Sequence, residues 1–204
     1  MASDSSQERS YAGREFYFGR GRSPLCDRIT IIAQPGGRQK LNLIDLGCGE
    51  GRDTLYFASR GFEVTAVDVS EAALADLTQR AANMGVQLTT VQESILSYTL
   101  RWHYDVVFSN KLHYIPEWRR ASRLHHLMDH TAPGGLHGFT VLVHDPSKRR
   151  PPDLDNYVYP FQGGELLGFY DCWEVLYYQD ETVDCSRGGT PHQHTYSHII
   201  ARRK

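Results

Sequence analysis

The sequence predicts an α/β fold in which a mostly parallel sheet of seven strands ends in an antiparallel hairpin. Strand-like apolar runs alternate with helix-like segments over most of the chain, which is typical of parallel sheets. A glycine-rich turn at 47–51 directly follows the first of these runs, and Asp68 ends the second. In a βαβ unit, a carboxylate at that position is suited to the hydroxyls of a ribose.

The predicted strands share short apolar or alternating runs, and they are 43–46, 63–67, 88–91, 104–108, 136–143, 173–178 and 195–201. The predicted helices share amphipathic spacing, and they are 24–33, 53–59, 70–83, 118–131 and 165–170. Pro24 suits a first helical turn, Ser70 is a good N-cap, and Gly61 and Gly85 end their helices. The last two strands are expected to pair antiparallel.

Length and composition predict one domain. The 204 residues have 40% hydrophobic residues and a formal net charge of −2, as in an ordinary globular protein. We expect a disordered tail at 1–12 and a single domain at 13–204. Within it, 13–40 form an N-terminal lid and helix, and 144–165 form a lid-like insertion.

Composition also bounds location and partners. No apolar run reaches the ~20 residues of a membrane span, and the polar N-terminus lacks the apolar centre of a signal peptide, so we expect a cytoplasmic protein. Near-neutral charge argues against nucleic acid as a partner, and the basic runs 148–150 and 202–204 are expected to be solvated ends. We expect a small-molecule partner, no membrane, and a monomer or homodimer.

The glycine turn indicates which adenosine ligand is bound. Gly47, Gly49 and Gly51 form G-x-G-x-G, whereas the dinucleotide fingerprint needs G-x-G-x-x-G. Asp45, two residues before Gly47, would repel a pyrophosphate but suits a cationic ligand. S-adenosyl-L-methionine carries a sulfonium and an ammonium, and this pattern is similar to the first motif of class I methyltransferases. We therefore predict S-adenosyl-L-methionine as cofactor, with Asp68 on its ribose.

Further cofactor contacts are expected at the carboxyl ends of the strands. Arg52 is expected either to hold the methionine carboxylate or to pair with Asp45. Glu93 is a candidate for the adenine amine, with a surface carboxylate as the alternative, and Ile95 for the ring face. Cys48 is most simply a packing residue. The full set of predicted cofactor contacts is Tyr17, Asp45, Gly47, Cys48, Gly49, Gly51, Arg52, Asp68, Val69, Glu93, Ser94, Ile95, Ser109 and Asn110.

From about Tyr11 to Lys204 the chain resembles the tellurite-resistance methyltransferases and their small-molecule relatives. The motifs that carry the resemblance are REFYFGRGRSPL, LIDLGCGEGRDTLYFASRGFEVTAVDVS, YDVVFSNKLHYI, HTAPGGLHGFTVLV, PFQGGELLGFYDCWEVLYY and PHQHTYSHIIARRK. The resemblance implies a Rossmann-like class I methyltransferase fold and an N-terminal segment that closes over the cofactor. The family commonly has asparagine where this chain has Asp53, and many class I methyltransferases have aspartate where it has Glu93.

Methyl transfer needs alignment and exclusion of water more than a strong base, because the leaving group is a neutral thioether. Groups that hold an anionic acceptor are therefore the catalytic candidates: His192, His194 and Arg187, with His113 as an alternative base. The i, i+2 spacing puts His192 and His194 on one face of a strand. Predicted substrate contacts are Arg14, Phe18, Lys111 and Tyr114, and Lys111 is equally well explained as a solvated side chain.

The sequence does not predict a metal site. The four cysteines show no C-x-x-C spacing, so neither a disulfide framework nor a zinc ribbon is indicated. His192, His194 and His198 with Cys185 are possible zinc ligands by type. However, a strand rising ~3.3 Å per residue places His198 about 20 Å from His192, so all three cannot share an ion.

The sequence favours a methyltransferase acting on a small molecule, with a chalcogen oxyanion (tellurite or selenite) or a thiol as candidate acceptors. One alternative is an N- or O-methyltransferase of a small-molecule biosynthetic pathway. Another, of a different class, is a non-catalytic sensor of S-adenosyl-L-methionine. Strand four ends in Ser-Asn-Lys-Leu-His-Tyr, which lacks the Asn/Asp-Pro-Pro-Tyr type of motif that stacks a flipped base.

Overall fold

The computed structural model describes residues 21–33, 40–147, 149–186 and 189–204. The chain forms two compact units, Met1–Thr99 and Leu100–Lys204. The predictions for the tail at 1–12 and for Arg14, Tyr17, Phe18 and Arg187 lie outside the described residues.

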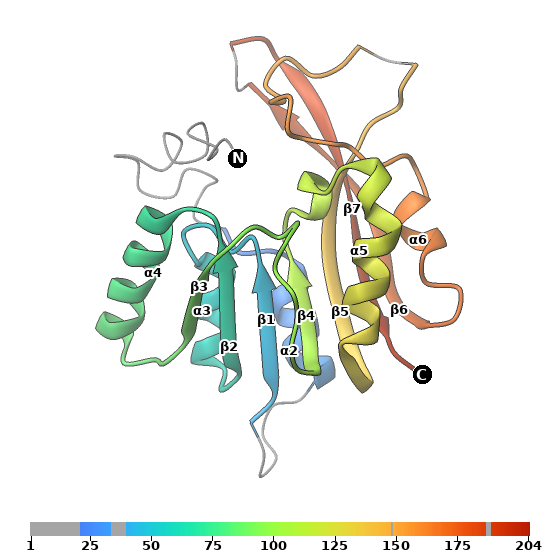
Figure 1. Ribbon diagram of the computed structural model, residues 1–204. Helices are drawn as coiled ribbons and strands as arrows, with labels where there is room; N and C mark the ends of the chain where they lie inside the picture. The colour runs from blue at the N-terminus through green and yellow to red at the C-terminus, as the bar shows by residue number, and fades with distance from the viewer. Residues whose placement is uncertain (1–20, 34–39, 148, 187–188) are drawn as a thin grey trace. The chain divides into compact units, whose positions relative to one another are not determined.

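The first unit carries three parallel strands in the order β3-β2-β1 (Figure 1). The strands are β1 (Asn42–Leu46), β2 (Glu63–Asp68) and β3 (Thr89–Gln92), and the helices are α2 (Leu25–Ala33), α3 (Arg52–Ser59) and α4 (Glu71–Met84). Helix α3 contacts β2, and α4 contacts both β2 and β3. Each predicted element of this unit is present, with boundaries within one or two residues of those expected.

Local chemistry explains these elements. In β1, Leu43, Ile44 and Leu46 are fully buried, as expected for a strand covered on both faces. The Ser70 side chain accepts a hydrogen bond from the Ala73 amide and caps α4. Apolar residues of α3, β2 and α4 then form one core cluster, which consists of Leu55, Ala66, Leu74, Leu77 and Ala81.

The second unit carries four strands in the order β4-β5-β7-β6. They are β4 (Tyr104–Ser109), β5 (Thr131–Val143), β6 (Glu174–Cys185) and β7 (His192–Arg202), with the helices η1 (Leu112–Tyr114), α5 (Glu117–Asp129) and α6 (Glu165–Gly168). Strands β4 and β5 are parallel, whereas β7 is antiparallel to both β5 and β6. The predicted antiparallel hairpin at the end of the chain is present.

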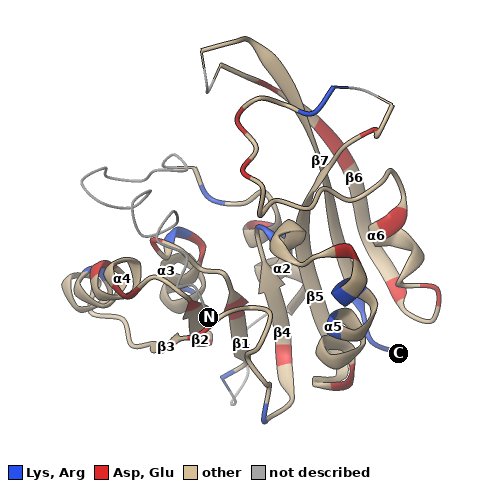
Figure 2. Cartoon of the chain, turned by 45° about the horizontal axis from the view of Figure 1, so that its top comes forward, with Lys and Arg blue, Asp and Glu red and all other residues tan. Residues whose placement is uncertain are grey.

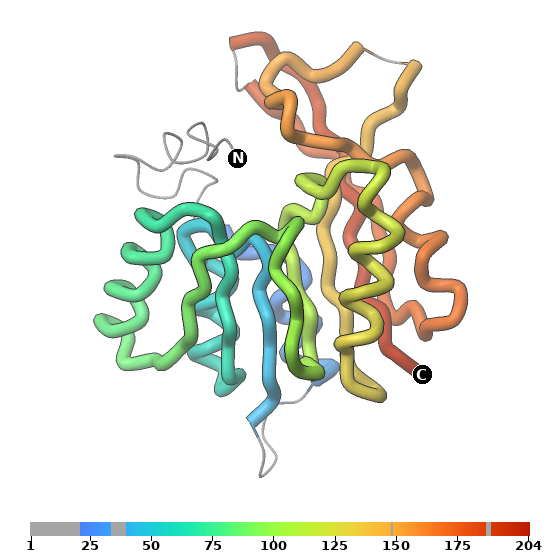
Figure 3. The backbone as a smooth tube through the Cα atoms, viewed as in Figure 1, coloured from blue at the N-terminus to red at the C-terminus, as the bar shows by residue number. Residues whose placement is uncertain are grey.

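Three strands of this unit are longer than the sequence predicted. Strand β5 begins at Thr131 instead of 136, because Pro133 and Gly134 are accommodated where its register against β4 shifts. The hairpin strands extend until Cys185 pairs with His192. Polar residues dominate that extension, so its hydropathy gave no strand signal. The loop that follows β5 lies beside this end of the hairpin (Figure 3).

The buried guanidinium of Arg120 ties three segments of the second unit together. It donates to the carbonyl oxygens of Ile115, Tyr159 and Pro160, and it pairs with Glu165 at 2.7 Å. The guanidinium also stacks over the Phe161 ring, 3.9 Å from its centroid. Since the side chain is only 2% exposed, these carbonyl groups would have little access to water if it were removed.

Replacing Arg120 with methionine should therefore destabilise the protein by about 3–5 kcal/mol, because the partly exposed Glu165 carboxylate and several carbonyl groups lose a buried charged partner. Urea unfolding followed by circular dichroism measures this difference. Arg119→Met at the neighbouring exposed position is the matched control and should change stability by less than about 0.5 kcal/mol. Equal effects of the two variants would contradict the structural role of Arg120.

Candidate functional site

The glycine turn of the first unit has the backbone that the sequence predicted. Gly47, Gly49 and Gly51 have φ values of 75°, 54° and 74°, in the left-handed region that favours glycine. The Gly47 and Cys48 amides donate to the Val67 carbonyl, at 2.8 and 3.1 Å. The turn is thereby fixed to the end of β2. An added Cβ at Gly51 would lie 2.2 Å from Leu77 Cδ1, so this glycine also permits the close approach of α4.

Asp68 at the end of β2 holds the same turn. Its Oδ2 accepts a hydrogen bond from the Gly49 amide at 2.7 Å, and its Oδ1 accepts one from the Ser70 amide at 3.0 Å. A carboxylate offers about four lone-pair sites, so these two bonds leave capacity for the two hydroxyls of a ribose. The predicted ribose residue is thus also a part of the turn's own framework.

Asp45 is a buried acid next to the turn. It is 2% exposed, and its Oδ2 accepts a hydrogen bond from Thr54 Oγ1 at 2.6 Å. Burial, followed by the negative charges of Asp53 and Asp68, raises the pKa of Asp45 to about 8. An ammonium or sulfonium placed nearby would favour the ionised form, which fits the predicted cationic ligand.

Charged side chains at the start of α3 lie close together. Arg52 Nε lies 3.6 Å from Asp53 Oδ1, and its positive charge acts on Asp45 less strongly than burial does. Asp53, where the family commonly has asparagine, is buried and accepts a hydrogen bond from the Ser23 amide at 2.8 Å. It therefore joins the segment before α2 to α3. The two predicted tasks of Arg52 remain predictions.

The other predicted cofactor residues of this unit lie around Asp68. The Glu93 amide donates to the Asp68 carbonyl at 3.0 Å, and the Gln92 side chain donates to the Val69 carbonyl. The Ser94 hydroxyl accepts from the Leu96 amide and shapes the turn that contains Ile95. Cys48 packs against the core cluster around Leu77, as its small side chain suggested.

In the second unit, the predicted residues after β4 form the short helix η1. Ser109 ends β4 and is fully buried, and Lys111 caps η1, which Tyr114 completes. His113 Nδ1 accepts a hydrogen bond from the Leu142 amide at 3.0 Å. Burial, followed by the charge of Lys111, lowers the pKa of His113 to about 3. These contacts favour a structural task for His113 and speak against a base.

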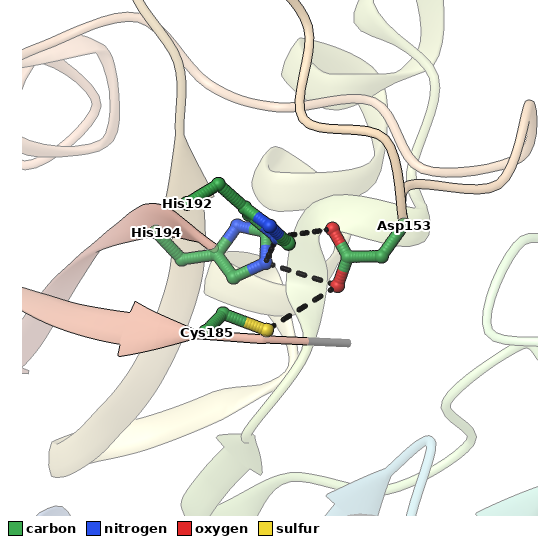
Figure 4. Close-up of side chains that lie close together, drawn as sticks. All are labelled: Asp153, Cys185, His192 and His194. Carbon is green, nitrogen blue, oxygen red and sulfur yellow. Dashed lines mark hydrogen bonds and ion pairs between the residues drawn. The ribbon is translucent and has the colours of Figure 1, made fainter. Parts of the chain in front are cut away.

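His192 and His194 face each other as their spacing predicted, and the structure adds two partners to them (Figure 4). Their Nε2 atoms are 3.1 Å apart. Asp153, from the loop after β5, places Oδ1 2.8 Å from His192 Nε2 and Oδ2 3.1 Å from His194 Nε2. Cys185 Sγ, at the end of β6, lies 3.7 Å from Asp153 Oδ2. Burial raises the pKa of Asp153, but hydrogen bonds and charge from the two histidines outweigh it, so the pKa is lowered.

A cavity of about 620 Å³ adjoins this cluster. His192 and His194 form part of its wall, and Asp145, Arg149 and Arg150 face it from the loop after β5. Figure 2 shows a basic segment in that loop. The sequence predicted the run at 148–150 to be solvated; Arg149 and Arg150 are exposed, and both also line this cavity. Both nitrogens of the cavity-lining His192 have partners, because its Nδ1 lies 2.7 Å from the Thr190 carbonyl oxygen.

Sequence reasoning missed Asp153, Arg149 and Arg150. Asp153 lies 39 residues from His192 in an irregular, proline-bearing stretch that offers no periodic pattern. Proximity to the histidines follows only from the path of the loop after β5. The designation of 144–165 as a lid-like insertion was the one signal that could have directed attention to these residues.

Comparison with known proteins assigns the family. The family model described as "Tellurite resistance protein TehB" matches residues 7–191. The chain belongs to the TehB family. It is 24% identical over 198 residues to the "Probable S-adenosyl-L-methionine-dependent methyltransferase TehB" of Haemophilus influenzae strain 10810, which covers 95% of this chain and 68% of that protein. The resemblance inferred from the sequence motifs is thereby confirmed.

Solved structures confirm the predicted class I methyltransferase fold. The crystal structure of TehB from Haemophilus influenzae aligns with a TM-score of 0.77 at 22% identity, over 97% of this chain and 67% of that one. The N-methyltransferase NodS from Bradyrhizobium japonicum WM9, in complex with S-adenosyl-L-homocysteine, aligns with a TM-score of 0.69 at 16% identity, over 98% of this chain and 97% of that one.

The raised pKa of Asp45 predicts a pH-dependent loss of stability. The unfolded carboxyl has a pKa near 3.8 and the folded one about 8, so between these values only the folded chain retains the proton. The stability that this group contributes is therefore present below about pH 4 and is lost as pH rises through about 8. Asp45→Asn should be about 2–4 kcal/mol more stable than the unmodified protein at pH 8.5.

At pH 5 the stabilisation by Asp45→Asn should be clearly smaller, because most of the loss of stability occurs between pH 5 and pH 8, where only the folded carboxyl retains its proton. Urea unfolding at both pH values measures the two differences, with the exposed Asp76→Asn as the control for losing one negative charge. A stabilisation by Asp45→Asn that is the same at pH 5 and pH 8.5 would contradict the assigned titration.

Proposed function

We propose that this chain transfers a methyl group from S-adenosyl-L-methionine to a small anionic acceptor, and that the acceptor enters the cavity beside the β6–β7 hairpin. The enzyme class and the cofactor predicted from the sequence agree with the family and with the relatives named above. The observation that carries the proposal is the glycine turn with Asp45 and Asp68. The buried carboxylates beside that turn support binding of a cation, and Asp68 supports binding of a ribose.

The reaction places modest demands on the protein. A lone pair of the acceptor forms the new bond to the methyl carbon while the bond from that carbon to sulfur breaks. The electron pair stays on sulfur, and S-adenosyl-L-homocysteine leaves as a neutral thioether. Since no proton must reach the leaving group, alignment and exclusion of water account for most of the rate. An acceptor that is already anionic, such as a thiolate or an oxyanion, needs no base.

The cavity supports an anionic acceptor. Arg149 and Arg150 contribute positive charge to its wall. Among the described residues that line the cavity, Asp145 is the acidic one. Arg150 is held in place by hydrogen bonds to the carbonyls of Asp155 and Val158. The exposed Arg149 is therefore the better candidate for contact with the acceptor. Contacts from His192, His194, Lys111 and Tyr114 stay predictions.

The size of the cavity also favours a second candidate. At about 620 Å³ it lies in the range of pockets that bind drug-sized ligands, and an oxyanion such as tellurite fills only a small part of it. An organic acid or thiol of a biosynthetic pathway would fill more of the cavity and meet the same basic side chains. The second candidate function is therefore methylation of such a compound on oxygen, nitrogen or sulfur.

Where the protein works is a further proposal. Among the helices of the described residues, none has both the length and the apolar character that crossing a membrane requires. We propose that the enzyme works in the cytoplasm, the compartment in which its cofactor is made.

Replacing Asp68 with asparagine should weaken cofactor binding by about 2–3 kcal/mol, because hydrogen bonds from a ribose to a charged acceptor are lost. Calorimetric titration with S-adenosyl-L-homocysteine measures the dissociation constant. Asp76→Asn, an exposed charge on α4, is the matched control and should leave it unchanged. Unchanged binding to a folded Asp68→Asn protein would remove the basis of the cofactor assignment.

Methyl transfer to tellurite, selenite, small thiols, organic acids and amines identifies the acceptor. We expect turnover with an anionic member of this panel. For that acceptor, Arg149→Ala should raise KM about tenfold, as expected for one lost charge-assisted contact, and leave cofactor binding unchanged. Arg119→Ala is the control. Turnover of amines alone would overturn the proposal of an anionic acceptor. Cofactor binding without turnover of any compound would favour the alternative of a non-catalytic sensor of S-adenosyl-L-methionine.

A further inference from the structure

The cluster beside the cavity contains four side chains of types that bind transition metals. Asp153, Cys185, His192 and His194 each offer one ligand atom, and these atoms all lie within 4.8 Å of one another (Figure 4). The side chains are withdrawn from water, since Asp153 is 4% exposed, His194 5% and His192 12%. They come from three segments, namely the loop after β5, the end of β6 and the start of β7.

The hydrogen bond of His192 to the main chain sets its tautomer. Its Nδ1 lies 2.7 Å from the Thr190 carbonyl oxygen, and a carbonyl only accepts, so Nδ1 carries the proton. In the neutral ring, Nε2 then presents a lone pair toward Asp153 and His194. Histidines that bind metals are commonly oriented in this way, with the outer nitrogen donating to a carbonyl or a carboxylate.

The hydrogens of two imidazole rings and an ionised carboxylate do not satisfy this cluster. Each Nε2 has a single in-plane site, which holds either a hydrogen or a lone pair, and an ionised carboxylate only accepts. Each Nε2 lies within hydrogen-bond distance of two partners, the other Nε2 and one Asp153 oxygen. With Asp153 ionised, any placement of hydrogens leaves at least one of these three short contacts with two hydrogens or two lone pairs facing each other. One cation at the centre accepts all of the lone pairs at once.

The spacing of the ligand atoms fits tetrahedral coordination. Bonds of about 2.0–2.1 Å from zinc to nitrogen or oxygen and about 2.3 Å to sulfur place neighbouring ligand atoms about 3.3–3.6 Å apart. With Asp153 Oδ2 as the carboxylate ligand atom, it lies 3.1 Å from His194 Nε2 and 3.7 Å from Cys185 Sγ, and the two Nε2 atoms are 3.1 Å apart, all within a few tenths of an ångström of that range. We propose that Asp153, Cys185, His192 and His194 bind one transition-metal ion of the zinc type.

The donor set also points to a structural ion. A thiolate and a carboxylate together balance the charge of a divalent ion, so the buried site becomes neutral on binding. Four protein ligands close a tetrahedral shell, which is typical of structural zinc sites, whereas catalytic sites keep one position open. The ion therefore fastens the loop that carries Arg149 and Arg150 to the β6–β7 hairpin. This assigns His192 and His194 a task other than catalysis, and it departs from the sequence-based expectation of no metal.

The first test measures metal directly, without cofactor or acceptor, so its outcome is independent of the proposed function. Protein without a polyhistidine tag is stripped with a chelator, dialysed and titrated with Zn²⁺ against a chromogenic indicator. We expect one equivalent of Zn²⁺ per chain. Co²⁺ in place of Zn²⁺ should give the visible bands of tetrahedral cobalt together with a thiolate-to-cobalt charge-transfer band in the near ultraviolet.

Variants locate the ion. Cys185→Ser should abolish the charge-transfer band, and both Cys185→Ser and Asp153→Asn should weaken Zn²⁺ binding by more than about tenfold, since even loss of an outer-shell partner typically costs about 10–100-fold. The matched controls are Cys172→Ser and Asp155→Asn, both at exposed positions, and they should bind as the unmodified chain does. Circular dichroism shows whether each variant is folded.

Limited proteolysis supplies a second measurement, which uses the unmodified protein and therefore still tests the proposal if one variant does not fold. Zn²⁺ should slow cleavage between residues 144 and 163 in the unmodified protein and in both control variants. Binding of no metal by the folded unmodified chain would overturn the proposal, and so would equal Zn²⁺ affinity in Cys185→Ser, Asp153→Asn and their controls.

Discussion

The hydrogen bond from the Gly49 amide to the Asp68 carboxylate is the constraint on which the first unit depends. It joins the carboxyl end of β2 to the glycine turn after β1 at 2.7 Å. A turn with three glycines in the left-handed region loses much conformational entropy on folding. The carboxylate opposes that cost by fixing the turn in the form that a ligand needs. The residue proposed to bind the ribose therefore also shapes the surface around it.

The same turn concentrates negative charge away from water. Asp45, Asp53 and Asp68 are all buried within the first unit, and the repulsion of Asp53 and Asp68 helps to raise the pKa of Asp45. In the unliganded protein, the mutual repulsion of these charges costs stability. A cationic ligand gains a great deal from it, because charges interact strongly where water is excluded. Stability is thus given up at the place where binding requires it.

The second unit uses buried charge differently. Arg120 donates to main-chain carbonyls and pairs with Glu165, and it holds the segment around Phe161 beside α5. Asp153, in the middle of the same loop, reaches His192 and His194 on the hairpin. Two points of an otherwise irregular segment are therefore fixed by polar contacts of buried side chains, which explains how a stretch without regular structure can form the wall of a cavity.

The sequence by itself determined the alternation of strands and helices, the glycine turn, Asp68 at the end of β2 and the shared face of His192 and His194. These features follow from local periodicity and from backbone requirements of single residues. Only the tertiary structure decided that Asp153 joins the histidines, that His113 accepts from the Leu142 amide, and that Arg149 faces a cavity. The physical reason is that burial and contacts between residues far apart in the chain set these features, and neither leaves a periodic signal in the sequence.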